Sequence, residues 1–358
     1  MSRAFSTYLN LLRLLAALAV FFSHAALQSF TGGTVWAPSL MGHKAVILFF
    51  VLSGYVIAYV AREREHTFAV FAVSRAARIY SVAVPALAIS FVIQLLLWHL
   101  GETAPVYQLT QPFKYLPVFL TFTGDAWFLN EDAFANVPYW SLFYEVWYYA
   151  AFAAAFYLRG WARIAVLAAV VLATGPRIWL LAPLWLAGCL VYRLHRGPGP
   201  GRRTARLLFV ASLLAAGFIL AADPNSAMNA WADRLSGGWM SANLRYSRYV
   251  LGDLLTGGIV AINLYAAPYA ELRFGAAARP IAWAASFTFA LYLLHYPLLD
   301  LYSTLALPAP LLIAAVLVSV LLLGQVTERQ KDRLRAWLMA WLAFITQGKA
   351  LAGRARPG

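Results

Sequence analysis

Residues 79–100 read IYSVAVPALAISFVIQLLLWHL and contain no Asp, Glu, Lys or Arg. A helix of ~20 apolar residues crosses the hydrocarbon core of a bilayer, so this stretch predicts a membrane-spanning helix. Ten further apolar segments can be recognised, and none shows the strand alternation of an outer-membrane barrel. They are 7–27, 43–61, 114–127, 138–158, 162–174, 177–193, 206–222, 247–267, 281–304 and 308–324.

The overall composition also indicates a membrane protein. Apolar residues make up 62% of the 358 residues and charged residues only 12%, whereas soluble domains contain about 45–50% and about 25%. The many aromatic and branched side chains exclude a disordered chain. The single cysteine, Cys189, excludes an internal disulfide and a cysteine-based metal cluster. We therefore expect an all-α polytopic membrane protein with little mass outside the bilayer.

Basic residues orient the expected spans. Lys and Arg number 28 against 14 Asp and Glu, and such an excess can indicate nucleic-acid binding or cytoplasmic loops. If all eleven segments crossed, the basic run 193–206 would lie outside the cell. If 114–127 is re-entrant or interfacial instead, 21 of the 28 basic residues lie on the cytoplasmic side. The positive-inside rule therefore predicts about ten transmembrane helices, with the N-terminus and C-terminus cytoplasmic, and no nucleic-acid partner.

The end of the chain differs from the rest. Residues 1–330 form one transmembrane domain in this interpretation, and residues 331–358 form a basic cytoplasmic tail. Trp337 and Trp341 lie among basic residues in 328–346, a pattern typical of an amphipathic helix. We expect this helix to lie on the inner leaflet, where membrane lipids with anionic headgroups attract basic side chains.

Ionisable residues inside apolar segments are functional candidates, because a charge at mid-membrane costs ~2.5–3.5 kcal/mol on insertion scales. Arg13 and His24 both fall in 7–27. Eleven residues at 100° each place them on the same face of one helix, ~16 Å apart along its axis. Alone, Arg13 could snorkel to the interface and His24 could be a packed, hydrogen-bonded histidine, but the shared face favours a site. Asp253 and His295 are further candidates, and the sequence offers no partner for Asp253.

Glu145 is the acidic candidate. It falls in a segment where Ser141 and Tyr149 share its helix face. Trp140 stands five residues earlier and is expected at the outer membrane interface, where aromatic side chains are enriched. Glu145 is then expected at a depth in the membrane comparable with that of His24. A carboxylate beside a histidine orients the ring and raises its basicity, which predicts a general base. The alternative is a structural polar pair between two helices.

Arg75 and Arg78 form a second cationic candidate. They share a helix face at the cytoplasmic end of the third apolar segment. Two guanidiniums at that position suit a phosphorylated cytosolic ligand. The alternative is ordinary positive-inside charge.

Together these residues resemble the acyltransferase 3 family of membrane acyltransferases over about residues 7–330. Five motifs occur in the family's order on the matching segments. Two positions depart from the pattern, because Ser81 and Gln330 stand where the family usually has proline. The matches are 13–24 for R-x10-H, 49–55 for F-F-x-x-S-G-F/Y, 75–79 for R-x-x-R-I, 140–149 for W-S-L-x-x-E-x-x-x-Y, and 286–297 for S-x5-Y-L-x-H-x-P.

The resemblance implies a membrane O-acyltransferase of the bacterial cytoplasmic (inner) membrane. Its donor would be acetyl-CoA or another acyl-CoA, and no metal would be needed. The acyl group would pass to a hydroxyl of an envelope polysaccharide, a lipid-linked sugar or another hydroxylated acceptor.

The resemblance also implies roles for the candidate residues. His24, oriented by Glu145, would act as general base or acyl relay, and Arg13 would stabilise negative charge on the donor or the oxyanion. Arg75 and Arg78, with Arg13, would bind the donor. The remaining candidates would line the substrate site: Ser53, Trp140, Ser141, Tyr149 and His295.

A second hypothesis is a transporter of an envelope precursor or acyl compound. Buried Arg, His and Glu would then be substrate or proton sites. No inverted repeat is evident in the sequence, and a scaffold without chemistry would leave the ordered motifs unexplained. An acyltransferase is therefore the favoured interpretation.

Overall fold

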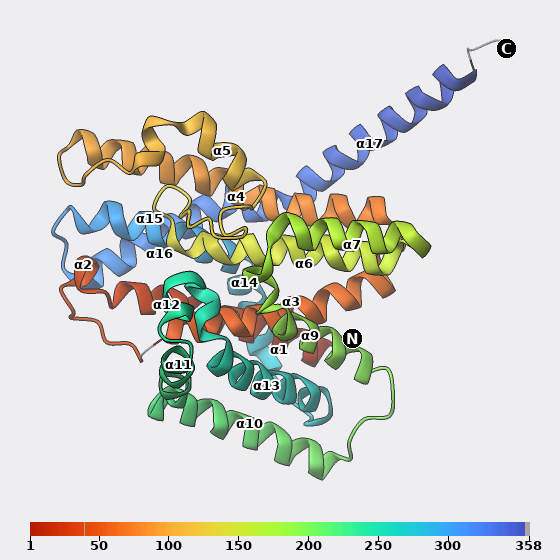
Figure 1. The fold of residues 1–358 in the computed structure, drawn as a ribbon. Helices are drawn as coiled ribbons and strands as arrows, with labels where there is room; N and C mark the ends of the chain where they lie inside the picture. Colours follow the sequence, from red (N-terminus) through yellow and green to blue (C-terminus); the bar gives the residue numbers. More distant parts are fainter. Residues whose placement is uncertain (39, 355–358) are drawn as a thin grey trace.

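The computed structural model describes residues 1–38 and 40–354, and side chains as far as residue 345. These residues fold into helices joined by loops, and no β-strand occurs among them. Figure 1 shows most of the long helices running roughly side by side along one direction. The prediction of an all-α protein is confirmed.

Within the described residues, seven helical stretches are long and apolar enough to cross a membrane. A bent pair adds an eighth if it forms one span: η5 (Gly275–Ala277) with α14 (Ala278–Ala285) meets α15 (Thr288–Ser303) at 50°. The chain is therefore a multi-pass membrane protein. The seven are α1 (Arg3–Ala25); α3 (Met41–Glu63); α4 (Phe68–His99); α8 (Pro176–Trp179) with α9 (Ala182–Leu194); α10 (Arg202–Ala222); α13 (Val250–Ala266) with η3 (Arg245–Tyr249) and η4 (Ala267–Tyr269); and α16 (Ala309–Val326) continued by η6 (Glu328–Gln330) and α17 (Lys331–Arg354).

The bent pair and two further helices, α6 (Trp140–Tyr157) and α7 (Gly160–Thr174), account for the difference from the expected ten spans. α5 (Pro112–Leu120), which that count already leaves out, has 9 residues, about 14 Å of helix against a hydrocarbon core of about 30 Å. α6 has 18 residues, but Glu145 and its many Tyr and Trp side chains lower its hydropathy. α7 has only 15 residues. The count of about ten spans stays a prediction, as does the cytoplasmic placement of both termini.

The two ends of the bundle differ. The N-terminus of the chain lies at one end, called here the N-terminal end (Figure 1, right), whereas α2, α11 and α12 lie at the opposite end. The short elements that connect the long helices are α2 (Gln28–Thr31), η1 (Tyr107–Thr110), η2 (Val137–Tyr139), α11 (Pro224–Leu235) and α12 (Trp239–Asn243).

Buried ion pairs hold the loops at the opposite end. Arg245 donates to Asp125 at 2.6 Å and to Asp132 at 2.6 Å. Arg177, which is almost fully buried, donates to the Asn243 carbonyl. Burial raises the pKa of Asp125 to about 6, although the Arg245 guanidinium lowers it. The loop that follows α5 is thereby fixed against η3 and α8.

A close helix crossing positions the middle of α3. α3 packs against α1, α6, α9 and α13. A Cβ atom on Gly54 would lie 1.8 Å from the Trp185 backbone oxygen, and one on Gly188 would lie 1.9 Å from the Val51 oxygen. Small residues allow such backbone-to-backbone contact between membrane helices. The crossing therefore fixes Ser53, the neighbour of Gly54, beside α9.

The C-terminal helix leaves the body of the protein. α17 packs against α4, and Figure 1 shows its far end projecting away from the bundle. Trp337 and Trp341 are exposed along it. The placement of the tail on a membrane leaflet stays a prediction, and residues 355–358 of that tail lie outside the described residues.

Candidate functional site

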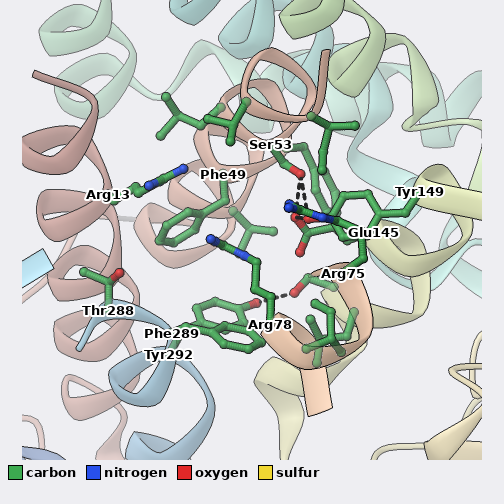
Figure 2. A pocket seen from close by; sticks show the side chains of 18 residues that line it. Arg13, Phe49, Ser53, Arg75, Arg78, Glu145, Tyr149, Thr288, Phe289 and Tyr292 are labelled. Atoms are coloured by element: carbon green, nitrogen blue, oxygen red, sulfur yellow. Dashed lines mark hydrogen bonds between the residues drawn. The ribbon is translucent and has the colours of Figure 1, made fainter. Parts of the chain in front are cut away.

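A cavity of about 60 Å³ lies between α1, α3, α4, α6 and α15 (Figure 2). It extends from the first third of α4, near the N-terminal end of the bundle, to the middle of α1. The five helices are distant in sequence, so the fold assembles the cavity from separate motifs. Seven of the ten site residues predicted from the sequence line it: Arg13, Ser53, Arg75, Arg78, Ser141, Glu145 and Tyr149.

Glu145 is held within one wall of this cavity. Its Oε1 accepts hydrogen bonds from Ser53 Oγ at 2.5 Å and from the Tyr149 hydroxyl, one turn further along α6. Trp185 Nε1 donates to the same Ser53 Oγ at 3.2 Å. These hydrogen bonds link α3, α6 and α9, and they hold Ser53 and Glu145 side by side in the cavity wall.

Three guanidiniums reach the cavity from two other helices. Arg75 Nη2 donates to Glu65 Oε1 at 2.8 Å, so this arginine has a protein counter-ion. Arg13 and Arg78 differ, because neither forms a hydrogen bond or an ion pair with another side chain of the described residues. Figure 2 shows both directed toward the space between the helices. Two unpaired cations inside a membrane bundle suit an anionic ligand.

The histidines form a pair of their own. His24 Nδ1 lies 2.8 Å from His295 Nε2, and the rings stack with centroids 5.1 Å apart. His295 is fully buried, and Phe21 and Tyr296 pack edge-on against the pair. Among the described residues no hydrogen bond joins His24 to Glu145. The structure thus gives His24 a histidine partner in place of the expected glutamate.

The hydrogen bonds assign the tautomers of this pair. His295 Nδ1 lies 2.8 Å from the Leu291 carbonyl, which can only accept, so Nδ1 carries the proton. The Nε2 atom of a neutral His295 is then an acceptor, and His24 Nδ1 donates to it. His24 keeps a basic lone pair on Nε2. His295 therefore orients His24 as a carboxylate or carbonyl orients the catalytic histidine in other enzymes.

The histidine pair lies just beyond the cavity. Tyr292 lines the cavity and stands three residues, or about 4.5 Å of helix rise, before His295 on α15. Its hydroxyl donates to Ser141 Oγ at 2.8 Å, and its ring packs against Phe49. Tyr292 and Phe49 therefore form part of the cavity wall, and His295 lies one helical turn further along α15.

Trp140 takes a different position from the other candidates. Its side chain is 5% exposed and stacks on Tyr246 with centroids 4.1 Å apart, and His43 stacks on its ring at 5.7 Å. His43 in turn bonds Asp253 at 3.0 Å, which gives that acidic residue its partner. The structure places Trp140 in an aromatic stack outside the cavity, and its contact with substrate stays a prediction.

Sequence reasoning missed residues on α15 and beside it. Thr288, Phe289 and Tyr292 line the cavity. Glu328 Oε2 accepts from the backbone N–H groups of Phe289 at 3.0 Å and Ala290 at 2.9 Å. Its carboxylate thus caps the helix that carries Tyr292 and His295. A buried carboxylate at the end of an apolar segment was a usable signal, but a capping role depends on the bend before α15.

Comparison with known proteins identifies the class of this chain. Residues 6–329 match the family model described as an acyltransferase domain, so this multi-pass membrane protein falls in an acyltransferase class. The chain belongs to the acyltransferase 3 family, as the motifs predict. No curated protein and no solved structure matches the chain.

Proposed function

We propose that this protein is an O-acyltransferase of the bacterial cytoplasmic membrane. It takes acetyl from acetyl-CoA at the N-terminal end of the bundle, which then faces the cytoplasm, and transfers it to a hydroxyl. The acceptor is an envelope polysaccharide, a lipid-linked sugar or another hydroxylated compound reached from the opposite end. One observation carries the proposal: Arg13 and Arg78 face a cavity and form no ion pair with the described residues, and Tyr292 in its lining stands one helical turn from His295, the hydrogen-bond partner of His24.

The cavity suits the donor. The phosphates of acetyl-CoA need cations, and guanidiniums bind them through paired hydrogen bonds. Arg75 and Arg78 lie near the start of α4, close to the end of the bundle that the positive-inside rule places in the cytoplasm. Arg13 lies deeper, halfway along α1, where its charge stabilises negative charge on an extended donor that continues toward His24.

The proposed reaction uses His24 as a general base. His24 Nε2 takes the proton of the acceptor hydroxyl while the oxygen attacks the thioester carbonyl carbon. A new C–O bond forms and the C–S bond breaks. The CoA sulfur leaves with the bonding electrons and takes the proton from His24, which returns to its neutral tautomer. His295 fixes the His24 ring through both states.

Glu145 has a supporting role in this proposal. Its carboxylate holds Ser53 and Tyr149 together and shapes the wall facing Arg75 and Arg78. It also supplies a negative charge that offsets part of the positive charge in the cavity. Loss of Glu145 should therefore affect donor binding more than the proton transfer itself.

Purified protein in lipid nanodiscs tests the function. With radiolabelled acetyl-CoA and an envelope glycan or lipid fraction, we expect label in the acceptor and stoichiometric release of free CoA thiol. His24→Ala should reduce this rate by about 10²–10⁴, whereas His99→Ala removes an exposed histidine at the end of α4 and should leave it unchanged. Uptake of an intact acyl compound into proteoliposomes, without CoA release, would support a transporter instead and refute the proposal.

A further inference from the structure

A second hollow lies beside the first at the N-terminal end of the bundle. Its volume is about 250 Å³, and it shares Arg75 and Arg78 with the first cavity. Five cationic side chains and only two carboxylates line it, so its interior is strongly positive. The cations are Arg64, Arg75, Arg78, Lys331 and Arg335, and the carboxylates are Glu65 and Asp332.

Two of these cations come from α17. This helix begins at Lys331, just beyond residues 6–329 that match the family. Arg335 Nε donates to Ser74 Oγ on α4 at 2.9 Å, and this bond holds the first turns of α17 against α4. Lys331 and Arg335 are four residues apart and share one helix face. That face closes one side of the hollow.

The charges within the hollow are not balanced by the protein. Glu65 binds Arg75 through one oxygen at 2.8 Å, but Glu65 Oε2 and Arg75 Nε are buried and have no hydrogen-bond partner among the described residues. Within the described part of the chain, no carboxylate lies within 4.0 Å of the charged nitrogens of Arg78 or Lys331. A buried N–H group without an acceptor is costly. An anion with several oxygens would supply the missing acceptors.

We propose that α17 completes a phosphate-binding pocket, and that this pocket holds the nucleotide end of the acyl donor. The inference rests on the proposed function, which requires a donor whose acyl end occupies the first cavity. The diphosphate and 3′-phosphate of acyl-CoA lie at the other end of the same molecule. Arg75 and Arg78 line both spaces, so one extended ligand can occupy the two together. Lys331 and Arg335 then bind the phosphates as positioning and binding groups.

The pocket also has the chemistry of a phospholipid headgroup site, and the location favours the donor. The hollow adjoins the cavity that holds Arg13 and Glu145 and is bounded by α3, α4 and α17. A headgroup would need its acyl chains to leave between these helices. The experiment separates the two sources by changing the phosphates on the donor and the lipid independently.

The test uses three variants of the full chain in phosphatidylcholine nanodiscs. Lys331→Ala removes one cation without touching the bond between Arg335 and Ser74 that docks α17. The second variant combines it with Arg335→Ala. Arg333→Ala is the matched control, because Arg333 is exposed on the same helix and does not line the hollow. The measured quantities are kcat and KM with acetyl-CoA and with acetyl-pantetheine, which lacks the nucleotide phosphates.

We expect Lys331→Ala to raise KM for acetyl-CoA by about tenfold, the loss of one charge-assisted contact, and the double variant to raise it further. In Lys331→Ala and the double variant, kcat and the KM for acetyl-pantetheine should equal the wild-type values. In Arg333→Ala, kcat and KM for both donors should equal the wild-type values. An equal rise in KM for both donors, or an equal rise in the control Arg333→Ala, would refute the phosphate-binding pocket. A rise in KM that appears only when the nanodisc contains phosphatidylglycerol would show that the pocket binds lipid and would refute its role in donor binding.

Equilibrium binding of CoA itself separates this inference from the proposed function. Isothermal titration with CoA involves no turnover, and we expect Kd to weaken by the same factor as KM in both variants. If no variant, including the wild type, transfers acetyl while CoA binding still depends on Lys331, the proposed function fails and the pocket stands. If acetyl transfer is normal and the Kd for CoA is the same in the wild type and in the Lys331 and Arg335 variants, the pocket is refuted and the proposed function stands.

Discussion

The pairing of His24 with His295, rather than with Glu145, predicts a specific pattern of coupling between mutations. The perturbation is His295→Ala, made once in the wild-type protein and once in a His24→Ala background. In the structure His295 acts only through His24, because its Nε2 bonds His24 Nδ1 and its Nδ1 bonds a backbone carbonyl. Removing His295 should therefore matter only while His24 is present. Glu145→Ala, made in the same two backgrounds, provides the comparison.

The expected magnitudes follow from these contacts. Loss of a general base costs about 10²–10⁴ in rate, and loss of a partner that orients an active histidine costs about 10–100-fold. In the wild-type background, His295→Ala should therefore lower kcat by about 10–100-fold, the second of these ranges. In the His24→Ala background, the same change should lower kcat by less than about twofold. The coupling energy of the histidine pair is then about 1.4–2.8 kcal/mol. Glu145 shares no hydrogen bond with His24, so its effect should be the same in both backgrounds.

The assay is release of CoA thiol from acetyl-CoA by protein in nanodiscs, with all variants compared at equal amounts of monodisperse protein. His99→Ala serves as the histidine control. The reasoning is refuted if His295→Ala lowers the rate equally in both backgrounds. If instead the effect of Glu145→Ala disappears in the His24→Ala background, the histidine and glutamate pair predicted from sequence is the functional one.

Three further changes test how the site is held. Gly54→Ala places a Cβ atom 1.8 Å from the Trp185 backbone oxygen, so we expect a loss of at least about 1–3 kcal/mol in unfolding experiments; Gly217→Ala, in open space on α10, should be neutral or slightly stabilising. Glu328→Ala removes the cap of α15 and should lower the free energy of unfolding by about 0.5–2 kcal/mol and also lower kcat, because α15 carries His295. Arg245→Ala removes the closer cation of the buried Asp125 carboxylate and leaves only Arg177, 3.9 Å away, so we expect a loss of about 3 kcal/mol. Because burial raises the pKa of Asp125 to about 6, protonation relieves this cost, so the thermal shift of Arg245→Ala should be larger at pH 8 than at pH 5. Equal shifts at the two pH values would contradict that account.

The sequence could predict which residues form the site, because the relevant helices are regular. The eleven-residue interval between Arg13 and His24 depends only on helix geometry, and the intervals from Ser141 to Glu145 and Tyr149 fix one face of α6. Those residues, with Ser53, Arg75 and Arg78, do face one cavity or its neighbourhood. Membrane burial supports the same inference, since polar residues in apolar helices need a partner or a ligand.

The pairing of residues could not be predicted in the same way. Whether His24 meets Glu145 or His295 depends on how α1, α6 and α15 are rotated about their axes. Packing sets that rotation, through contacts such as the glycine crossing of α3 with α9 and the Glu328 cap at the bend before α15. Depth within the membrane was therefore a poor guide to contact. The segment count stays a prediction for a related reason, because α6 gains its polar network at the expense of hydropathy.

The partners of buried polar groups distinguish structural from functional residues in this bundle better than their depth does. Several intramembrane polar side chains look alike in the sequence, yet most are satisfied by another side chain. The satisfied pairs are His43 with Asp253, Gln94 with Asp300, and Tyr8 with Asn263. Arg13 and Arg78 lack such a partner among the described residues and face the cavity. A membrane bundle that leaves two guanidiniums without an ion pair incurs a cost that a bound anion would offset, and this cost is the reason for proposing that the cavity binds an anionic ligand.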